Sequence, residues 1–368
     1  MKGRFNRAEM AEALTAVCGA TATRTPKEIL KCVRLEALSD AILLTATDLE
    51  LGLRCAVTQV EVDKTGTVVV VADTLARIVR ECPDEILTIE DIQNLLHLKG
   101  MGSHFRIVTQ TPEDFPAVAS LEGEADFSID HAQLRRMVEW TVFAAAREST
   151  RYAINGVLWE VSGSKLTLAA TDGRRLAIAH GKLPAAPASS VPRVIVPGRA
   201  LSLLSRLPVV GDAAVQVRIT SNQLLMKVGG STIATILVEG HFPKYQDVIP
   251  ADCDRIVEMN TMEFLGALKR AALLTNEESK GVRLSFSDGE LTLSSRAPEQ
   301  GEATISLPIS YKGEPMDIGF NPVFLTDVLR VAGTEEIRFA FKEPNRPGIL
   351  RMGDEFLHVV MPVNLSSA

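Results

Sequence analysis

The chain has 368 residues, which is too long for one ordinary hydrophobic core and predicts two or three domains. Apolar residues make up 46% of it, but the longest apolar runs are only strand-sized, which excludes a membrane-spanning helix. The net charge of −7 hides an asymmetry, because residues 1–124, 125–250 and 251–368 carry net charges of −6, +5 and −6. The mean charge therefore does not exclude a nucleic-acid partner.

The cysteines and the start of the chain indicate the compartment. Five cysteines are scattered without a Cys-x-x-Cys pair, and the six histidines are scattered as well. This distribution favours reduced thiols over a disulfide framework, and it argues against a metal centre. The first ten residues contain no hydrophobic signal segment. We therefore expect a cytoplasmic protein that uses no cofactor and no metal and does not bind membranes.

In chain order, the predicted elements recur three times, each spaced by about a third of the chain. Three markers recur in the same order. They are Ala-Thr-Asp at 46–48 and 170–172 with Ser-Ser-Arg at 294–296, strand-to-helix passages that align Ala72, Pro197 and Asn321, and prolines at 116, 243 and 362. We expect three domains, at residues 1–124, 125–250 and 251–368.

Each repeat is predicted to have two halves, each made of a strand, a helix and further strands. An apolar stripe at helical spacing predicts a first helix over 130–147 in the second repeat, and a shorter second helix is expected at 197–207. Strands joined by hairpin signals follow, for instance around 162–165, 220–223 and 287–290. The pattern favours an α+β fold with two helices on one face of antiparallel sheets, rather than a Rossmann fold.

The predicted helices carry basic residues on the side expected to face solvent. Lysine and arginine on a single helix often only solvate an exposed face, but here the bias recurs in five helices of an acidic protein. Acidic clusters lie instead in expected loops and strands, as at 61–63 and 334–337. We therefore expect a positive helical surface. Its residues are Arg77, Arg80, Arg135, Arg136, Arg147, Arg199, Arg206, Lys269, Arg270 and Arg330.

Several segments together resemble one family over essentially the whole chain. They are RYAINGVLWE (151–160), AATDGRRLA (169–177), HFPKYQDVIP (241–250), TNEESKGVRL (275–284), GFNPVFLTDVL (319–329) and VVMPVNL (359–365). In order and spacing they are similar to the bacterial DNA polymerase III beta subunit family, the beta sliding clamps. The resemblance implies three repeated clamp domains and a closed ring of two chains joined head to tail, with helices lining the hole.

The resemblance also implies a function without catalysis. About twelve helices at an axis separation of roughly 8–10 Å leave a hole of roughly 20–30 Å, which accommodates duplex DNA. Basic side chains on the lining would bind phosphates without recognising bases, and Arg24 and Tyr152 join them by resemblance. The implied protein is a processivity factor that tethers the DNA polymerase III catalytic subunit. Its other implied partners are the clamp loader and further polymerases and repair proteins with clamp-binding peptides.

Partners of the family insert a short peptide with bulky apolar residues into a cleft between the second and third domains. Arg174 stands where many relatives have histidine, Asp247 stands where a basic residue is expected, and the chain extends past the usual end. The matching positions are Ile154, Thr171, Gly173, Arg174, Arg175, Leu176, Pro243, Asp247, Val248, Asn321, Phe324, Val360, Met361 and Pro362.

The Asp172-Gly173 pair is interpreted as a turn rather than as part of an active site. Asp48 occupies the equivalent place in the first repeat, and no second matched carboxylate or nucleophile motif accompanies Asp172. Aspartate accepts hydrogen bonds from nearby backbone N–H groups in such turns, and glycine adopts the positive φ angle.

The ring interface implied by the resemblance joins domain one of one chain to domain three of the other. Phe105 and Ile107 are expected to meet Leu273 and Leu274 in a contact that closes after two copies. The charge partners are left open, because Asp73 stands where a basic residue is usual. Two alternatives also stay open from the residues alone: a three-domain enzyme with a site between domains, and a monomeric DNA-binding or scaffold protein.

Overall fold

The structure is a computed structural model that describes residues 1–368 except 147–152, 210, 276–280 and 365–368. It divides into two compact units, each made of separate stretches of the chain. Unit 1 comprises Met1–Arg135, Ser162–Ser164 and Lys182–Val238, and unit 2 comprises Arg136–Val161, Lys165–Gly181 and Glu239–Ala368.

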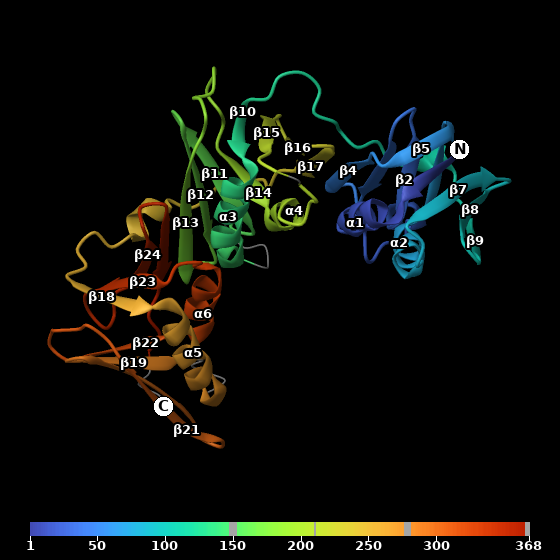
Figure 1. The fold of residues 1–368 in the computed structure, drawn as a ribbon. Coiled ribbons are helices and arrows are strands. Elements are labelled where there is room, and N and C mark those ends of the chain that lie inside the picture. The colour runs from blue at the N-terminus through green and yellow to red at the C-terminus, as the bar shows by residue number, and fades with distance from the viewer. Residues whose placement is uncertain (147–152, 210, 276–280, 365–368) are drawn as a thin grey trace. The chain divides into compact units, whose positions relative to one another are not determined.

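The elements follow one another in the predicted threefold order (Figure 1). The first repeat contains β1 (Lys2–Asn6), α1 (Arg7–Cys18), the 3-10 turn η1 (Glu28–Lys31), β2 (Cys32–Ala37), β3 (Ile42–Thr47), β4 (Leu51–Val57), β5 (Val60–Lys64), β6 (Gly66–Val71), α2 (Ala72–Glu81), β7 (Ile86–Ile92), β8 (Leu95–Gly100), β9 (Ser103–Val108) and η2 (Pro112–Asp114). The second contains β10 (Phe127–Asp130), α3 (His131–Thr141), η3 (Val142–Ala144), β11 (Gly156–Ser162), β12 (Lys165–Thr171), β13 (Arg175–Lys182), β14 (Val194–Pro197), α4 (Gly198–Leu204), β15 (Ala214–Ile219), β16 (Gln223–Val228), β17 (Ser231–Ile236) and η4 (Tyr245–Val248). The third contains β18 (Arg255–Asn260), α5 (Thr261–Ala271), η5 (Ala272–Leu274), β19 (Val282–Ser287), β20 (Glu290–Ala297), β21 (Gly301–Pro308), β22 (Met316–Phe320), α6 (Pro322–Val331), β23 (Glu336–Phe341), β24 (Gly348–Met352) and β25 (Phe356–Val360).

Unit 1 contains two antiparallel sheets and the packed helices α1 and α2. One sheet has the order β5-β1-β7-β8-β9, so β9 is an edge strand, and the other has the order β10-β15-β16-β17-β4-β3-β2-β6. In the larger sheet, β17 of the second repeat pairs with β4 of the first, over 231–235 and 51–55. Backbone hydrogen bonds therefore continue the sheet from one repeat into the next.

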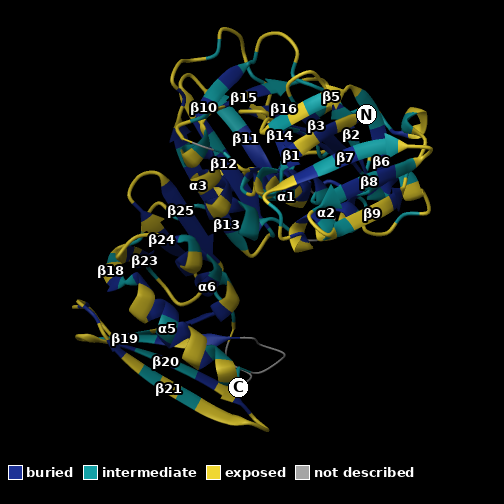
Figure 2. Cartoon of the chain, turned by 45° about the vertical axis from the view of Figure 1, so that its right-hand side comes forward, coloured by how far each residue is buried: buried dark blue, intermediate teal, exposed yellow. Residues whose placement is uncertain are grey.

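Unit 2 has the same plan, with α5 packed against α6. Its larger sheet contains the run β11-β12-β13-β25-β24-β23-β18, in which β13 of the second repeat pairs with β25 of the third. The smaller sheet has the order β21-β20-β19-β22, and Figure 2 shows exposed residues along its edge strand β21. An aromatic cluster fills the core of this unit, with the rings of Phe286 and Phe341 at 4.3 Å between centroids.

Side-chain caps explain where α1, α3, α5 and α6 begin, whereas within the described residues α2 and α4 begin without a side-chain cap. Asn6 caps α1, Asn260 caps α5 and Asn321 caps α6, each by accepting a backbone N–H of the first helical turn. Asp130 does the same for α3 by accepting from Gln133 N at 2.7 Å. Among the described helices, none is long and apolar enough to cross a membrane.

The first helix of the second repeat is shorter than the predicted span of 130–147. It ends at Thr141, whose hydroxyl donates to the Met137 carbonyl at 2.8 Å, and the 3-10 turn η3 follows. A β-branched residue with a hydroxyl that bonds the preceding turn weakens a helix, which accounts for the early end. Likewise, α4 covers 198–204 rather than 197–207.

Candidate functional site

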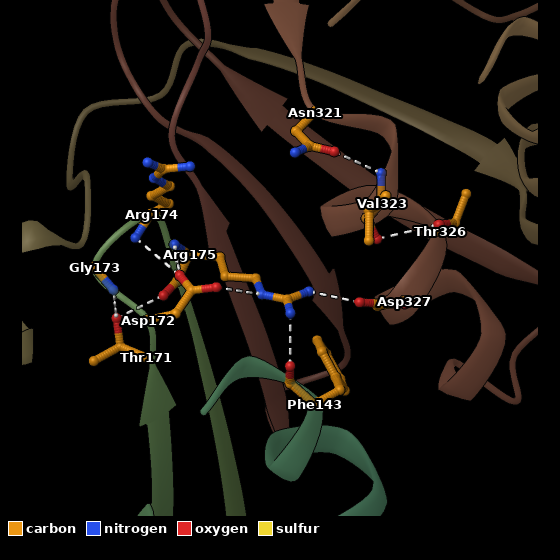
Figure 3. A network of polar contacts seen from close by, with 10 residues as sticks. All are labelled: Phe143, Thr171, Asp172, Gly173, Arg174, Arg175, Asn321, Val323, Thr326 and Asp327. Atoms are coloured by element: carbon orange, nitrogen blue, oxygen red, sulfur yellow. Dashed lines mark hydrogen bonds and ion pairs between the residues drawn. The ribbon is translucent and has the colours of Figure 1, made fainter. Parts of the chain in front are cut away.

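The turn between β12 and β13 is built by its own side chains (Figure 3). Asp172 Oδ1 accepts from the backbone N–H groups of Arg174 and Arg175 at 2.9 and 3.1 Å. Thr171 Oγ1 donates to the Arg175 carbonyl at 2.6 Å and accepts from Gly173 N, and Gly173 has a φ of 86°. The predicted role of Asp172-Gly173 as a turn is confirmed.

The guanidinium of Arg175 is enclosed by groups from three elements of unit 2 (Figure 3). It donates to Asp172 Oδ2 at 3.1 Å, to Asp327 Oδ2 of α6 at 2.8 Å and to the Phe143 carbonyl at 2.7 Å. It also lies 4.6 Å from the ring centre of Phe324. The side chain is 10% exposed. Its charge is thus used to hold the turn, η3 and α6 together.

A buried histidine lies on the same side of the sheet as Arg175. His358 of β25 is fully buried, and its ring centre is 5.6 Å from that of Phe143. Burial, and then the charge of Arg175, lowers the pKa of His358 from 6.5 to about 3. The Phe324 backbone offsets part of this, but within the described part of the chain neither imidazole nitrogen has a hydrogen-bond partner of acceptable geometry. His358 is therefore neutral at physiological pH.

Replacing His358 with phenylalanine should make the stability of unit 2 less dependent on pH. Because the pKa of His358 is about 3 in the folded chain and 6.5 in an unfolded one, the unfolded state takes up a proton first as the pH falls. Stability is therefore lost from about pH 6.5 downwards, by about 2 kcal/mol between pH 7 and pH 5. Urea unfolding followed by tryptophan fluorescence tests this, since Trp140 and Trp159, the two tryptophans of the chain, both lie in unit 2. Equal loss in wild type and His358→Phe would contradict it.

An apolar cavity of about 210 Å³ lies beside this turn, entirely within unit 2. Leu176 of β13 pairs in register with Val359 of β25, so both point to the cavity side of the sheet. Nine predicted cleft residues line the cavity: Ile154, Thr171, Gly173, Arg174, Arg175, Leu176, Pro243, Val248 and Met361. The remaining walls come from Lys244, Tyr245 and Val359, which the sequence prediction did not include.

The structure places five predicted cleft residues elsewhere. Val360 is fully buried and pairs with Arg175, on the opposite face from Val359. Asn321 caps α6, and Phe324 contacts Arg175. Asp247 is exposed in η4 and does not line the cavity.

The fifth, Pro362, belongs to a neighbouring cavity. This cavity of about 590 Å³ shares Met361 with the first one and is lined by the Arg283–Asp317 ion pair, among other residues.

Tyr245 lines the first cavity and was not among the predicted cleft residues. It is buried and donates its hydroxyl to Glu160 Oε2 at 2.5 Å. Its position two residues after Pro243, a predicted cleft residue, was the sequence feature that could have identified it.

The described members of the predicted DNA-facing set are all exposed. They are Arg24, Arg77, Arg80, Arg135, Arg136, Arg199, Arg206, Lys269, Arg270 and Arg330. Arg147 and Tyr152 lie outside the described residues. Arg199 is engaged within unit 1, where it forms an ion pair with Asp48 and donates to two backbone carbonyls. Arg77 forms an ion pair with Asp73 on its own helix at 3.0 Å.

The predicted interface residues lie on or near the two edge strands. Phe105 is 36% exposed on β9, whereas Ile107 on the same strand is 8% exposed and packs into its sheet. Leu273 is 76% exposed in η5, a turn that contacts β21. Leu274 lies in the same turn and is partly exposed.

The described residues contain no group of three or more histidine, cysteine or carboxylate side chains able to hold a metal ion.

Three family models match the chain in order and over most of its length. They are the N-terminal, central and C-terminal domains of the DNA polymerase III beta subunit, over residues 1–119, 128–244 and 246–364. The chain belongs to the DNA polymerase III beta subunit family.

Individual members of this family are similar along their whole length. The beta sliding clamp of Pseudomonas aeruginosa is 34% identical over 364 residues, which cover 98% of this chain and 99% of the relative. That of Escherichia coli is 33% identical over 340 residues, or 92% of each. Among solved structures, the Pseudomonas aeruginosa clamp bound to griselimycin has a TM-score of 0.91 at 33% identity and covers 99% of this chain and 100% of its own. The Bacillus subtilis clamp has a TM-score of 0.90 at 27% identity and covers 99% of each.

Membership in the family confirms the fold and the function expected from the resemblance. The chain is a DNA sliding clamp, a non-catalytic processivity factor that encircles duplex DNA as a ring-shaped homodimer and tethers DNA polymerase. The enzyme and the monomeric scaffold, the two alternatives from the sequence, are thereby set aside.

Proposed function

We propose that the cavity of about 210 Å³ receives the bulky apolar end of the short peptides by which partners attach to this clamp. One observation carries the proposal: an apolar hollow unites side chains from β13, η4 and the end of β25 within one unit. Leu176 and Val359 form its apolar floor, and Met361 stands 40% exposed at its mouth. A flexible methionine repacks readily around different side chains, which suits a site for several partners.

The cations at the cavity divide into two roles in this proposal. Arg175 positions the walls, because its guanidinium is already bonded to two carboxylates and a carbonyl. Arg174 extends away from that network in Figure 3 and, with Lys244, contributes positive charge to the lining. We expect these two side chains to contact polar parts of the peptide.

A tryptophan placed at the mouth of the cavity should report peptide binding. Val248 is 51% exposed and lines the cavity, whereas Ile256 on β18 is 54% exposed and does not. In Val248→Trp, adding a peptide that ends in Leu-Phe should shift the indole emission, because the ring leaves water.

Ile256→Trp is the matched control and should show no shift at the same peptide concentration. Met361→Asp added to Val248→Trp should abolish the response, because a carboxylate at the mouth would be desolvated by the peptide. A peptide that binds the protein without changing the emission at 248 would place the site elsewhere.

We further propose the remaining assignments made from the sequence. The domain boundaries at 1–124, 125–250 and 251–368 are supported by the threefold order of elements. The exposed basic residues, Arg199 among them, are assigned to the DNA-facing surface, since exposed cations bind phosphates without base recognition. Phe105, Ile107, Leu273 and Leu274 are assigned to the contact between protomers, supported by the edge strands beside them. A cytoplasmic location is supported by five free cysteines.

A further inference from the structure

We infer that Asp73 of one protomer pairs with Arg296 of the other where the two chains meet, as a charge-reversed copy of an ion pair inside the chain. The inference rests on the proposal that the third repeat of one protomer meets the first repeat of its partner. Its basis is the way an arginine joins consecutive repeats at two junctions within the chain.

The junction within unit 1 is held by Arg199, the second residue of α4. Its guanidinium forms an ion pair with Asp48, in the turn that links β3 to β4. It also donates to the carbonyls of Gly19 and Thr21, just after α1, at 3.1 and 3.0 Å. An aspartate of a hairpin is thus joined to the first turn of the second helix of the next repeat.

The junction within unit 2 uses the same parts in a different order. The hairpin carries both Asp172 and Arg175, and the guanidinium donates to the Phe143 carbonyl, just after α3. The next repeat contributes Asp327 from its second helix, α6, at 2.8 Å. In both junctions a guanidinium lies among a hairpin carboxylate, the carbonyl that follows a first helix, and the second helix of the next repeat.

The third repeat carries the opposite charge at the hairpin position. Arg296 stands 124 residues after Asp172, which itself stands 124 residues after Asp48. It is the penultimate residue of β20 and is exposed, opposite Glu302 of β21. Among the described residues, Arg296 forms no ion pair. The guanidinium of Arg296 can therefore pair with a carboxylate of another chain.

The helix that would follow in a ring carries the complementary reversal. In a head-to-tail dimer it is α2 of the other protomer. Counted from the first helical residue, which shifts the alignment by one residue from the sequence marker that aligns Ala72 with Pro197, Asp73 of α2 has the position that Arg199 has in α4. The Asp73 side chain is 77% exposed, and within the chain it pairs with Arg77. Aspartate and arginine have therefore exchanged places relative to the junction in unit 1, and the attraction between hairpin and helix is kept.

Because aspartate and arginine have exchanged places at this junction, the ring favours a partner chain with the same charges at positions 73 and 296. An exposed ion pair adds little affinity, but like charges placed opposite one another are strongly unfavourable. A protomer with the opposite arrangement at these two positions would meet like charges at both junctions. The pair therefore acts on which chains associate and how long they stay together.

The test is a charge exchange, followed by native mass spectrometry of subunit exchange between unlabelled and ¹⁵N-labelled rings. Asp73→Arg alone and Arg296→Asp alone should each speed exchange about tenfold, because each sets like charges opposite one another. The double variant should return exchange to within about threefold of wild type, since the attraction is restored. Mixed rings of wild type and double variant should form well below the statistical share.

Controls separate failure of the pair from failure of the ring. Asp288→Arg, at the other end of the β20 hairpin, should leave exchange unchanged, and circular dichroism should show wild-type unfolding for every variant. If neither single substitution changes the exchange rate, or if the double variant exchanges as fast as the single variants, the Asp73–Arg296 pair is wrong but the junction between protomers still stands. A wild-type chain that sediments as a monomer at micromolar concentration would overturn the junction on which it rests.

Discussion

A ring loaded onto a nicked circular plasmid should stay on it for hours at moderate salt and should leave within minutes of linearisation. Retention is topological, because a closed ring can leave a circle only by opening, whereas it slides off a free end. Electrostatic contacts alone weaken steeply as salt rises, so they cannot give long retention at moderate salt. Gel filtration of labelled clamp with plasmid, before and after cutting, measures this, and rapid loss from intact circles would contradict it.

Reversing charge on α5 should separate affinity from retention. Lys269→Glu with Arg270→Glu removes two exposed cations from the proposed DNA-facing surface. Each lost phosphate contact should make the negative slope of log binding constant against log salt shallower by about 1. Retention on intact circles should persist, because closure of the ring is unaffected.

The control for that variant is Lys227→Glu with Lys312→Glu, which reverses two exposed charges outside the helices. It should leave the salt dependence unchanged. If the control variant makes the slope shallower and the α5 variant does not, the basic helices face away from DNA.

Replacing Arg175 with methionine should destabilise unit 2 by about 3 kcal/mol, the largest stability effect expected from a single substitution at the cavity. The change leaves the carboxylates of Asp172 and Asp327, each 21% exposed, close together without a cation. Arg175→Lys should recover little, since an ammonium cannot satisfy two carboxylates and the Phe143 carbonyl in one planar arrangement. Urea unfolding followed by the fluorescence of Trp140 and Trp159 measures the loss.

The neighbouring arginine is the matched control. Arg174→Met removes an exposed side chain that points away from the network (Figure 3), so stability should change by no more than about 0.5 kcal/mol. Equal losses from the two substitutions would contradict a special role for Arg175. Peptide affinity should fall in Arg175→Met, because the turn that forms one wall of the cavity depends on its contacts.

Much of the fold and part of the cavity could be predicted from local sequence patterns. The threefold order followed from recurring short motifs, and the Asp172-Gly173 turn followed from residue types whose hydrogen bonds are local. The exposed cations on helices followed from helical spacing. These features depend on residues a few positions apart, so a sequence pattern is sufficient to predict them.

The features that were missed depend on pairing between distant segments. Val359 rather than Val360 faces the cavity, and this parity is fixed only by the register of β13 against β25. The ion pair of Arg199 with Asp48 was not predicted either, because the two residues lie 151 positions apart in the sequence. The early end of α3 reflects the Thr141 hydroxyl competing for a backbone carbonyl, an effect too small for an apolar periodicity to reveal.

The sheet pairings β17–β4 and β13–β25 bear on how the protein can be divided into fragments. Cutting at 124/125 or 250/251 would strip β4 or β13 of a hydrogen-bonded neighbour and leave a long apolar strand with unpaired backbone groups. Strand edges with unpaired backbone groups form hydrogen bonds with other chains and promote aggregation. The duplicated segments visible in the sequence are therefore units of ancestry, and they are unsuitable as separately expressed pieces.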